Sequence, residues 1–121
     1  MVVKSDGSGG GAFVAEHVAP AGYAVPMHVH ERDDEMFYVL EGELVLEDGS
    51  GVRRAGPGSF VALPKGVPHA FRNESATEVR FLVVTSPGVA TAEMFRHLDR
   101  AGSPAPEEIG AISAQYGVLM R

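Results

Sequence analysis

Turn-forming residues interrupt this chain at short intervals, and they limit the folds that it can adopt. Between Ala12 and Thr85, short segments rich in Val, Phe and Leu alternate with turns such as Pro20-Ala21-Gly22 and Pro64-Lys65-Gly66. We expect strands at residues 12–18, 25–30, 35–40, 43–47, 51–55, 59–63, 69–73 and 78–85. Roughly eight strands at spacings of about 8–12 residues are typical of a β-sandwich or barrel. Since no helix-length segment separates them, a parallel α/β sheet is disfavoured, and the predicted fold class is all-β.

Composition limits the size of the protein and the chemistry open to it. The chain has 121 residues, enough for one domain, and its 15 glycines and 8 prolines favour turns over a helical bundle. It has no cysteine, which excludes disulfides, iron–sulfur clusters and thiol nucleophiles. A net charge of −6 without a basic run predicts no binding to nucleic acid or anionic membranes. Without a signal-peptide pattern or an apolar stretch of ~20 residues, we expect a cytoplasmic protein.

The two ends of the chain differ from its strand-rich middle. Residues 1–11 are polar and rich in glycine and serine, so we expect a disordered tail. Residues 91–101 predict an amphipathic helix with Thr91 as its N-cap. Pro104 and Pro106 then interrupt the chain, and a second helix with Glu107 and Glu108 in its first turn stops at Gly117. These helices could cap the barrel, form a dimer interface or pack on its outer wall. The predicted organisation is one domain over residues 12–121, with a barrel at 12–86 and helices within 90–117.

Three histidines and one glutamate form the candidate site. His28 and His30 lie two residues apart in an expected strand, so their side chains point to the same face. If residues 31–34 close a hairpin, Glu35 begins the next strand almost opposite His30. His69 opens a later strand and could supply a fourth ligand from across the barrel.

The residue types in this cluster are those of a metal site. Neutral imidazole suits first-row metals such as Zn, Cu, Fe and Ni, and a carboxylate adds charge and affinity for harder ions. Four such ligands can leave positions on an octahedral ion for water, substrate or O₂. The other two histidines, His17 and His97, are expected to be ordinary surface or core residues.

Two longer patterns connect these residues to a known family. The first is Gly, five residues, His-x-His, three or four residues, Glu, six residues, Gly. The second is Gly, five residues, Pro-x-Gly, two residues, His, three residues, Asn. Through both patterns the sequence resembles the cupin superfamily, and in particular small bacterial monocupins of the quercetin-dioxygenase-like type. Both are complete here, at Gly22, His28, His30, Glu35 and Gly42 and at Gly58, Pro64, Gly66, His69 and Asn73.

The resemblance implies a jelly-roll β-barrel with two short C-terminal helices and a homodimeric state. It also implies a divalent first-row metal ion (Mn, Fe, Ni, Cu, Co or Zn) whose ligands are His28, His30, Glu35 and His69. Glu35 would double as the catalytic base. The remaining motif residues would be structural.

Side-chain alternation predicts the surroundings of this site. If Glu35 points inward, Phe37 and Val39 share its face, and His69 brings Phe71 inward in the same way. With Phe81 or Leu82 from the last expected strand, these side chains would line an apolar cavity for a small, flat or apolar molecule. Alternatively they simply fill the core, because small barrels have little spare interior volume.

Two functions from different classes are consistent with these features. The first is a metal-dependent enzyme acting on a small organic substrate, such as a dioxygenase of flavonol-like compounds or diketones; the same site could serve an isomerase or lyase. The second is a non-catalytic protein that binds a metal or small molecule, since one fold can host both roles. The complete set of four ligands favours metal chemistry over a metal-free store, and of the two functions we favour the enzyme.

Overall fold

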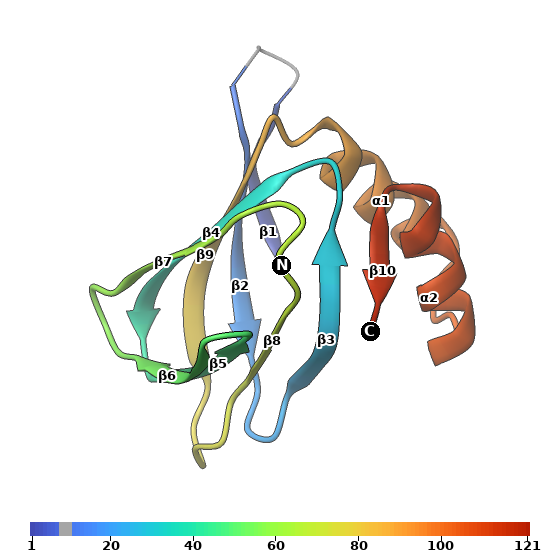
Figure 1. Cartoon of the computed structure of the whole chain (residues 1–121). Coiled ribbons are helices and arrows are strands. Elements are labelled where there is room, and N and C mark those ends of the chain that lie inside the picture. The colour runs from blue at the N-terminus through green and yellow to red at the C-terminus, as the bar shows by residue number, and fades with distance from the viewer. Residues whose placement is uncertain (8–10) are drawn as a thin grey trace.

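Two antiparallel β-sheets pack face to face in the computed structural model, which describes residues 1–7 and 11–121 (Figure 1). Each expected strand is present within one residue of its predicted bounds. The all-β class is confirmed, and the two sheets form a jelly-roll sandwich followed by two helices. The expected strands are β2 (Phe13–Ala19), β3 (Ala24–His30), β4 (Asp34–Glu41), β5 (Leu44–Asp48), β6 (Gly51–Ala55), β7 (Phe60–Leu63), β8 (His69–Arg72) and β9 (Val79–Ser86).

Two further strands lie where the sequence predicts none. Strand β1 (Val2–Asp6) pairs with β2, so the expected tail over residues 1–11 is wrong for these five residues; residues 8–10 lie outside the described part. Strand β10 (Val118–Met120) pairs with β3. Four of the five β1 residues are exposed, so this strand adds backbone hydrogen bonds at a sheet edge and shows no apolar pattern.

The strand order separates two segments that the sequence suggests are partners. One sheet has the order β1-β2-β9-β4-β7, and the other has the order β10-β3-β8-β5-β6. Strands β3 and β4 therefore lie in different sheets, and residues 31–34 cross between the sheets instead of closing a hairpin. Side-chain alternation determines which face of a strand turns inward, but it does not identify the neighbouring strand.

The core lies between the two sheets and is rich in aromatic rings. In β9 the inward positions alternate regularly, and Val79 and Phe81 are fully buried. The Phe37 ring of β4 lies 5.0 Å from that of Phe81 and 5.1 Å from that of Phe71 on the facing sheet. Such tilted ring pairs contribute about 0.5–1.5 kcal/mol each beyond simple burial.

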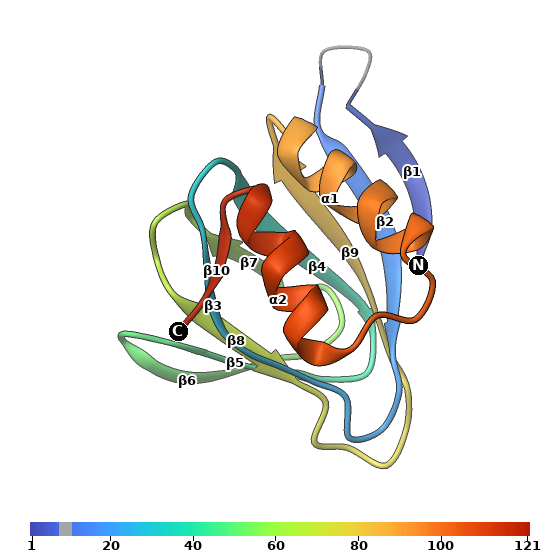
Figure 2. The same ribbon diagram turned by 90° about the vertical axis from the view of Figure 1, so that its right-hand side faces the viewer.

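The two C-terminal helices, α1 (Val89–Arg100) and α2 (Pro106–Gln115), lie beside each other along the open side of the sandwich (Figure 2). Helix α1 packs on β2, where the Phe95 ring stacks on that of Phe13 at 5.6 Å. The expectation that Thr91 caps α1 is wrong, because the N-cap is Gly88. The Thr91 hydroxyl instead donates a hydrogen bond to a buried carboxylate of the β3–β4 crossover.

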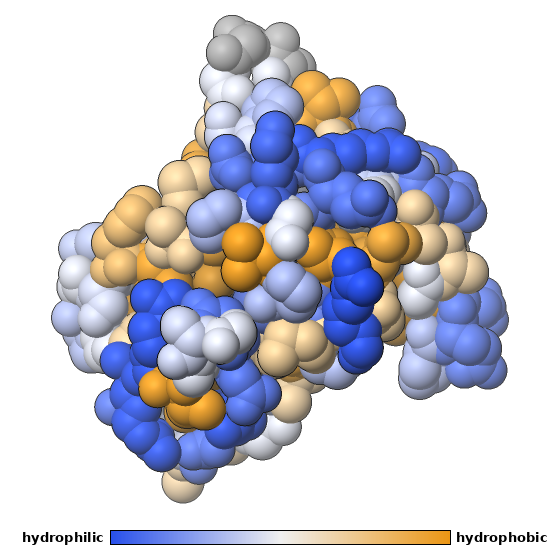
Figure 3. Space-filling model, in the orientation of Figure 1, coloured by the Kyte–Doolittle hydropathy of each residue, from blue (hydrophilic) through white to orange (hydrophobic). Residues whose placement is uncertain are grey.

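Charged side chains cover much of the outer surface. The face seen in Figure 3 carries an apolar band across its middle, with hydrophilic side chains above and below it. Among the described residues, neither helix is long and apolar enough to cross a membrane.

Candidate metal centre

The four predicted ligands converge between the sheets, although not from the expected directions. His28 and His30 come from β3, and His69 on the adjacent strand β8 lies directly opposite His28 in the sheet register. Glu35 comes from β4 in the facing sheet. Glu35 is thus the ligand from the facing sheet, and His69 lies beside His28 in the same sheet. The sequence suggests instead that Glu35 lies beside His30 and that His69 comes from across the barrel.

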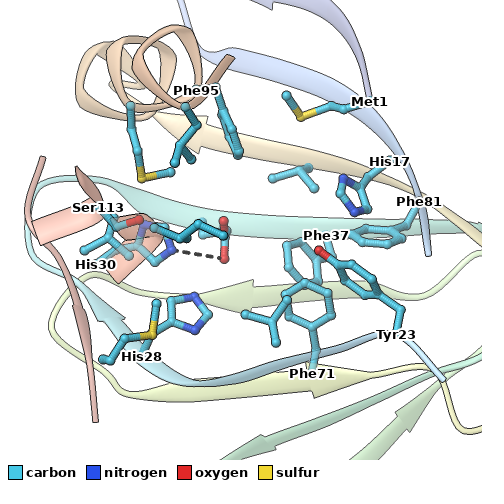
Figure 4. Close-up of a pocket in the computed structure, with 18 residues that line it drawn as sticks. Met1, His17, Tyr23, His28, His30, Phe37, Phe71, Phe81, Phe95 and Ser113 are labelled. Carbon is cyan, nitrogen blue, oxygen red and sulfur yellow. Dashed lines mark ion pairs between the residues drawn. The ribbon is translucent and has the colours of Figure 1, made fainter. Parts of the chain in front are cut away.

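The ligand atoms are close enough to share one ion. One nitrogen of each imidazole and one carboxylate oxygen all lie within 4.8 Å of one another. Glu35 Oε1 lies 3.0 Å from His69 Nε2 and 3.6 Å from His30 Nε2, the latter contact drawn in Figure 4. Metal bonds of about 2.0–2.2 Å hold two ligand atoms of one ion no more than roughly 4.4 Å apart. Small side-chain movements would therefore complete the coordination.

Backbone carbonyls orient two of the imidazoles. His28 Nδ1 lies 2.8 Å from the Pro26 carbonyl oxygen, and His69 Nδ1 lies 3.3 Å from that of Val67. When Nδ1–H donates to a carbonyl, Nε2 keeps its lone pair for a metal. His69 Nε2 also faces Glu35 Oε1, and a carboxylate oxygen cannot donate. A neutral His69 can donate from only one ring nitrogen, so its proton goes either to the Val67 carbonyl, which leaves Nε2 free for a metal, or to Glu35 Oε1.

The electrostatics keep these side chains in the forms that bind metals. Burial lowers the pKa values of His28 and His30, which favours neutral imidazoles. Burial alone would raise the pKa of Glu35, but the hydrogen bond with His69 and the nearby imidazoles outweigh it and lower the pKa. The result is a buried carboxylate among three imidazoles, with each ligand residue no more than 7% exposed. A buried anion needs a compensating charge, so the cluster is suited to a metal cation.

An apolar cavity of about 240 Å³ extends from this cluster (Figure 4). Phe37, Phe71 and Phe81 line it, as their alternation suggests. Val39 shares the inward face of β4 and packs within the core, but it does not line the cavity. Phe95 of α1 and the α2 residues Ile109 and Ser113 complete the wall, so the helices cover the open end of the sandwich above the candidate site.

Two polar side chains that the sequence analysis did not select also line the cavity. His17 lies on the inner side of β2, and Tyr23 lies in the turn before β3. The sequence contained a signal for His17, since Phe13, Ala15 and Ala19 turn inward at the same period. Tyr23 precedes its strand, where period-two alternation does not apply.

The comparisons with known proteins agree with this architecture. The family model described as cupin domain matches residues 14–85. Among solved structures, a cupin superfamily protein from Silicibacter pomeroyi, described as a sugar phosphate isomerase, superposes with a TM-score of 0.58 at 33% identity. The match covers 62% of this chain and 50% of that one.

The curated relatives differ in activity. The chain is 40% identical to the dimethylsulfoniopropionate lyase DddQ of Ruegeria pomeroyi, over 52% of this chain and 34% of the relative. It is 30% identical to a quercetin 2,3-dioxygenase of Bacillus subtilis (62% and 22%) and 32% identical to an oxalate-binding protein of Thermotoga maritima (54% and 54%). This chain thus spans about half or less of the length of these relatives.

Proposed function

From the premise that this chain belongs to the cupin domain family, we propose that it is a metal-dependent enzyme acting on a small, largely apolar, enolisable dicarbonyl compound. The proposal extends to a reaction with O₂ that cleaves a carbon–carbon bond of the substrate. It rests on one observation, the position of the buried His₃Glu cluster beside an aromatic-lined cavity.

The shape of the cavity selects among the substrates expected for such a site. Its volume of about 240 Å³ is below the range of about 300–1,000 Å³ typical of sites for drug-sized ligands. A 1,3-diketone with at most one ring therefore suits it better than a three-ring flavonol. The rings of Phe37 and Phe71 offer apolar contact and no positive charge, which disfavours a phosphorylated substrate.

Each ligand side chain has a role in this proposal. His28, His30, Glu35 and His69 hold the ion, which when bound supplies positive charge next to the substrate oxygens and lowers the pKa of an enol. Glu35 also serves as the base, taking a proton from the carbon between the two carbonyls. Its lowered pKa keeps the carboxylate ionised, which a proton acceptor requires, and also makes Glu35 a weaker base. The helices and the phenylalanines exclude bulk water.

The overall reaction balances with O₂ as the only co-reactant. A 1,3-diketone and one O₂ give one carboxylic acid and one 2-oxoaldehyde; the bond between the central carbon and one carbonyl carbon breaks, and each product receives one oxygen atom. The substrate is oxidised and O₂ is reduced within the products, so no external reductant is needed.

Proton transfer without O₂ is the second candidate. The 40% identity to a lyase favours it, as does the presence of two more titratable groups, His17 and Tyr23, in the same cavity. In that case Glu35 removes the same proton, and the substrate isomerises or eliminates a leaving group.

The test measures O₂ uptake and substrate loss together. The purified protein is loaded separately with each candidate divalent metal and given pentane-2,4-dione, 1-phenylbutane-1,3-dione or quercetin. We expect O₂ uptake with both diones and slower O₂ uptake with quercetin. The Glu35→Gln and His69→Ala variants should lose it, whereas Glu41→Gln, an exposed residue on the same strand, should not.

The pattern of results separates the candidates. Dione loss without O₂ uptake would favour proton transfer. Saturable dione binding with neither loss nor uptake would indicate a binding protein and contradict the enzyme. The homodimer expected from the resemblance remains part of the proposal, supported by the exposed, paired Tyr38 and Phe60 on the outer face of β4 and β7; light scattering of the purified protein checks it.

A further inference from the structure

His17 and Tyr23 face the cavity with their hydrogen-bonding capacity unused. Their rings lie 5.5 Å apart, and within the described part of the chain the side chain of neither one makes a hydrogen bond. The molecule contains a second histidine–tyrosine pair that behaves differently. His97 Nδ1 lies 3.0 Å from the Tyr116 hydroxyl, so that pair is satisfied internally, between α1 and the end of α2. The His17–Tyr23 pair has donors and acceptors left for a ligand.

Local structure holds both side chains in place. His17 is opposite Phe81 in the register of β2 and β9, and their rings lie 5.2 Å apart. The backbone of Tyr23 is anchored at both ends: its N–H donates to Pro20, and its carbonyl accepts from the Asn73 N–H at 2.8 Å. The ring of Tyr23 packs 6.2 Å from that of Phe71. A ligand would meet two polar groups whose positions are already set.

The pair lies at the other end of the cavity from the candidate metal ligands. In Figure 4, His28 and His30 lie on one side of the Phe37 and Phe71 rings, while Tyr23 and His17 lie on the other, with the Tyr23 hydroxyl directed into the cavity. The cavity thus has a metal-binding end, an aromatic middle and a second polar end.

We propose that His17 and Tyr23 form a subsite that hydrogen-bonds a neutral polar group, above all a hydroxyl, at the end of the substrate remote from the metal. This inference rests on the proposed function in one respect, namely that the substrate group at the metal end is a dicarbonyl. It narrows the substrate class to dicarbonyl compounds that carry a hydroxyl on an aromatic or similarly flat tail.

The chemistry of the two side chains supports a neutral partner. Burial raises the pKa of Tyr23, so its hydroxyl remains a donor. Burial also lowers the pKa of His17, which favours a neutral ring with one donor and one acceptor nitrogen. A ligand hydroxyl can accept from Tyr23 and donate to His17. A cationic group would lose its hydration in this apolar cavity and meet the like charge of the N-terminus, which also lowers the pKa of His17.

The experiment compares two ligands that differ only by the predicted hydroxyl. Binding of 1-phenylbutane-1,3-dione and 1-(4-hydroxyphenyl)butane-1,3-dione to the metal-loaded protein is measured by calorimetry under nitrogen, which prevents turnover with O₂. We expect the hydroxylated dione to bind about tenfold more tightly, the effect of roughly one well-formed hydrogen bond. Tyr23→Phe and His17→Phe should each reduce this preference to about twofold or less. Tyr38→Phe, on the outer face of β4, is the matched control and should keep the full preference.

The outcomes separate this inference from the proposed function. Equal binding of both diones, or a preference that both variants retain, overturns the subsite and leaves the metal-dependent function standing. If neither dione binds, the proposed function fails. The subsite is then tested separately, by comparing the binding of p-cresol and toluene to the metal-free protein. A preference for p-cresol that Tyr23→Phe abolishes supports the subsite; one that Tyr23→Phe leaves intact overturns it.

Discussion

The buried carboxylate of Asp33 accepts a hydrogen bond of 2.6 Å from the Thr91 hydroxyl, which ties the β3–β4 crossover to the first turn of helix α1. The same carboxylate accepts the backbone N–H groups of Gly88 and Thr91 at 3.0 and 3.1 Å. Asp33 lies two residues before Glu35, so one side chain links the candidate metal ligand to the helix that covers the cavity. The helix is capped from a distant part of the sequence.

Replacement of Thr91 by valine should test this link. Valine keeps the shape of the side chain but removes the donor, and a hydrogen bond to a charged group is worth about 1.5–3 kcal/mol. We expect the free energy of unfolding, measured by urea titration, to fall by about that amount. Thr77→Val, at an exposed position, is the control and should change it little. An equal effect of both substitutions would contradict a special role for Thr91.

Metal binding should stabilise the fold. Because the ligands come from three strands in two sheets, the unfolded chain cannot present them together. A metal at 100 times its dissociation constant adds about 2.7 kcal/mol to the free energy of unfolding. We expect the midpoint of thermal unfolding to rise when metal is added to the metal-free protein. His69→Ala should lose that rise and His97→Ala should retain it; a wild-type midpoint that metal does not move would count against the candidate centre.

Thr85 carries a buried hydroxyl that is unsatisfied. Its Oγ1 has no hydrogen-bond partner within the described part of the chain, and the residue is opposite Glu35 in the register of β4 and β9. An unpaired buried hydroxyl is costly, and a methyl group of similar size avoids that cost. Thr85→Val should therefore raise the free energy of unfolding by about 1 kcal/mol. A clear loss of stability would show that the hydroxyl is satisfied in solution.

His17 should make the stability of the metal-free protein depend on pH. Burial lowers its pKa below the usual 6.5, so as the pH falls below that value the unfolded chain takes up a proton that the folded state excludes. The stability that neutral His17 provides is complete above about pH 6.5 and declines below it. Urea unfolding at about pH 7.5 and about pH 5.5 should show that the free energy of unfolding falls more for the wild type than for His17→Phe when the pH is lowered. The three histidines of the candidate metal centre are present in both proteins, so their titration largely cancels in this difference. An equal loss of stability at acid pH in the two proteins would contradict the prediction.

Much of the fold and the composition of the candidate site could be predicted from the sequence. The spacing of turns located eight strands, and the two motifs identified the cluster of four side chains that the structure brings together. One motif glycine shows why that residue is required: Gly42 has a φ of 79°, and a Cβ there would lie 2.9 Å from Val79 Cγ2. Such a position is encoded by a single residue type and can therefore be recognised in a sequence.

The errors occurred where a residue's role depends on remote parts of the chain. The β1 strand exists because β2 offers it an edge, and Thr91 bonds Asp33 in place of its own helix end. His17 looked ordinary because Tyr23, its neighbour in the cavity, comes from a turn with no periodic pattern.

By itself, the sequence determined which side chains turn inward, because alternation along a strand and the conformations open to glycine and proline are local properties. Only the tertiary structure decided that Glu35 faces the three histidines from the opposite sheet, that two helices cover the cavity, and that a second polar pair lies at its other end. Those arrangements depend on which strands become neighbours, and pairing between remote segments is governed by the packing of the whole chain, which no short stretch of residues encodes.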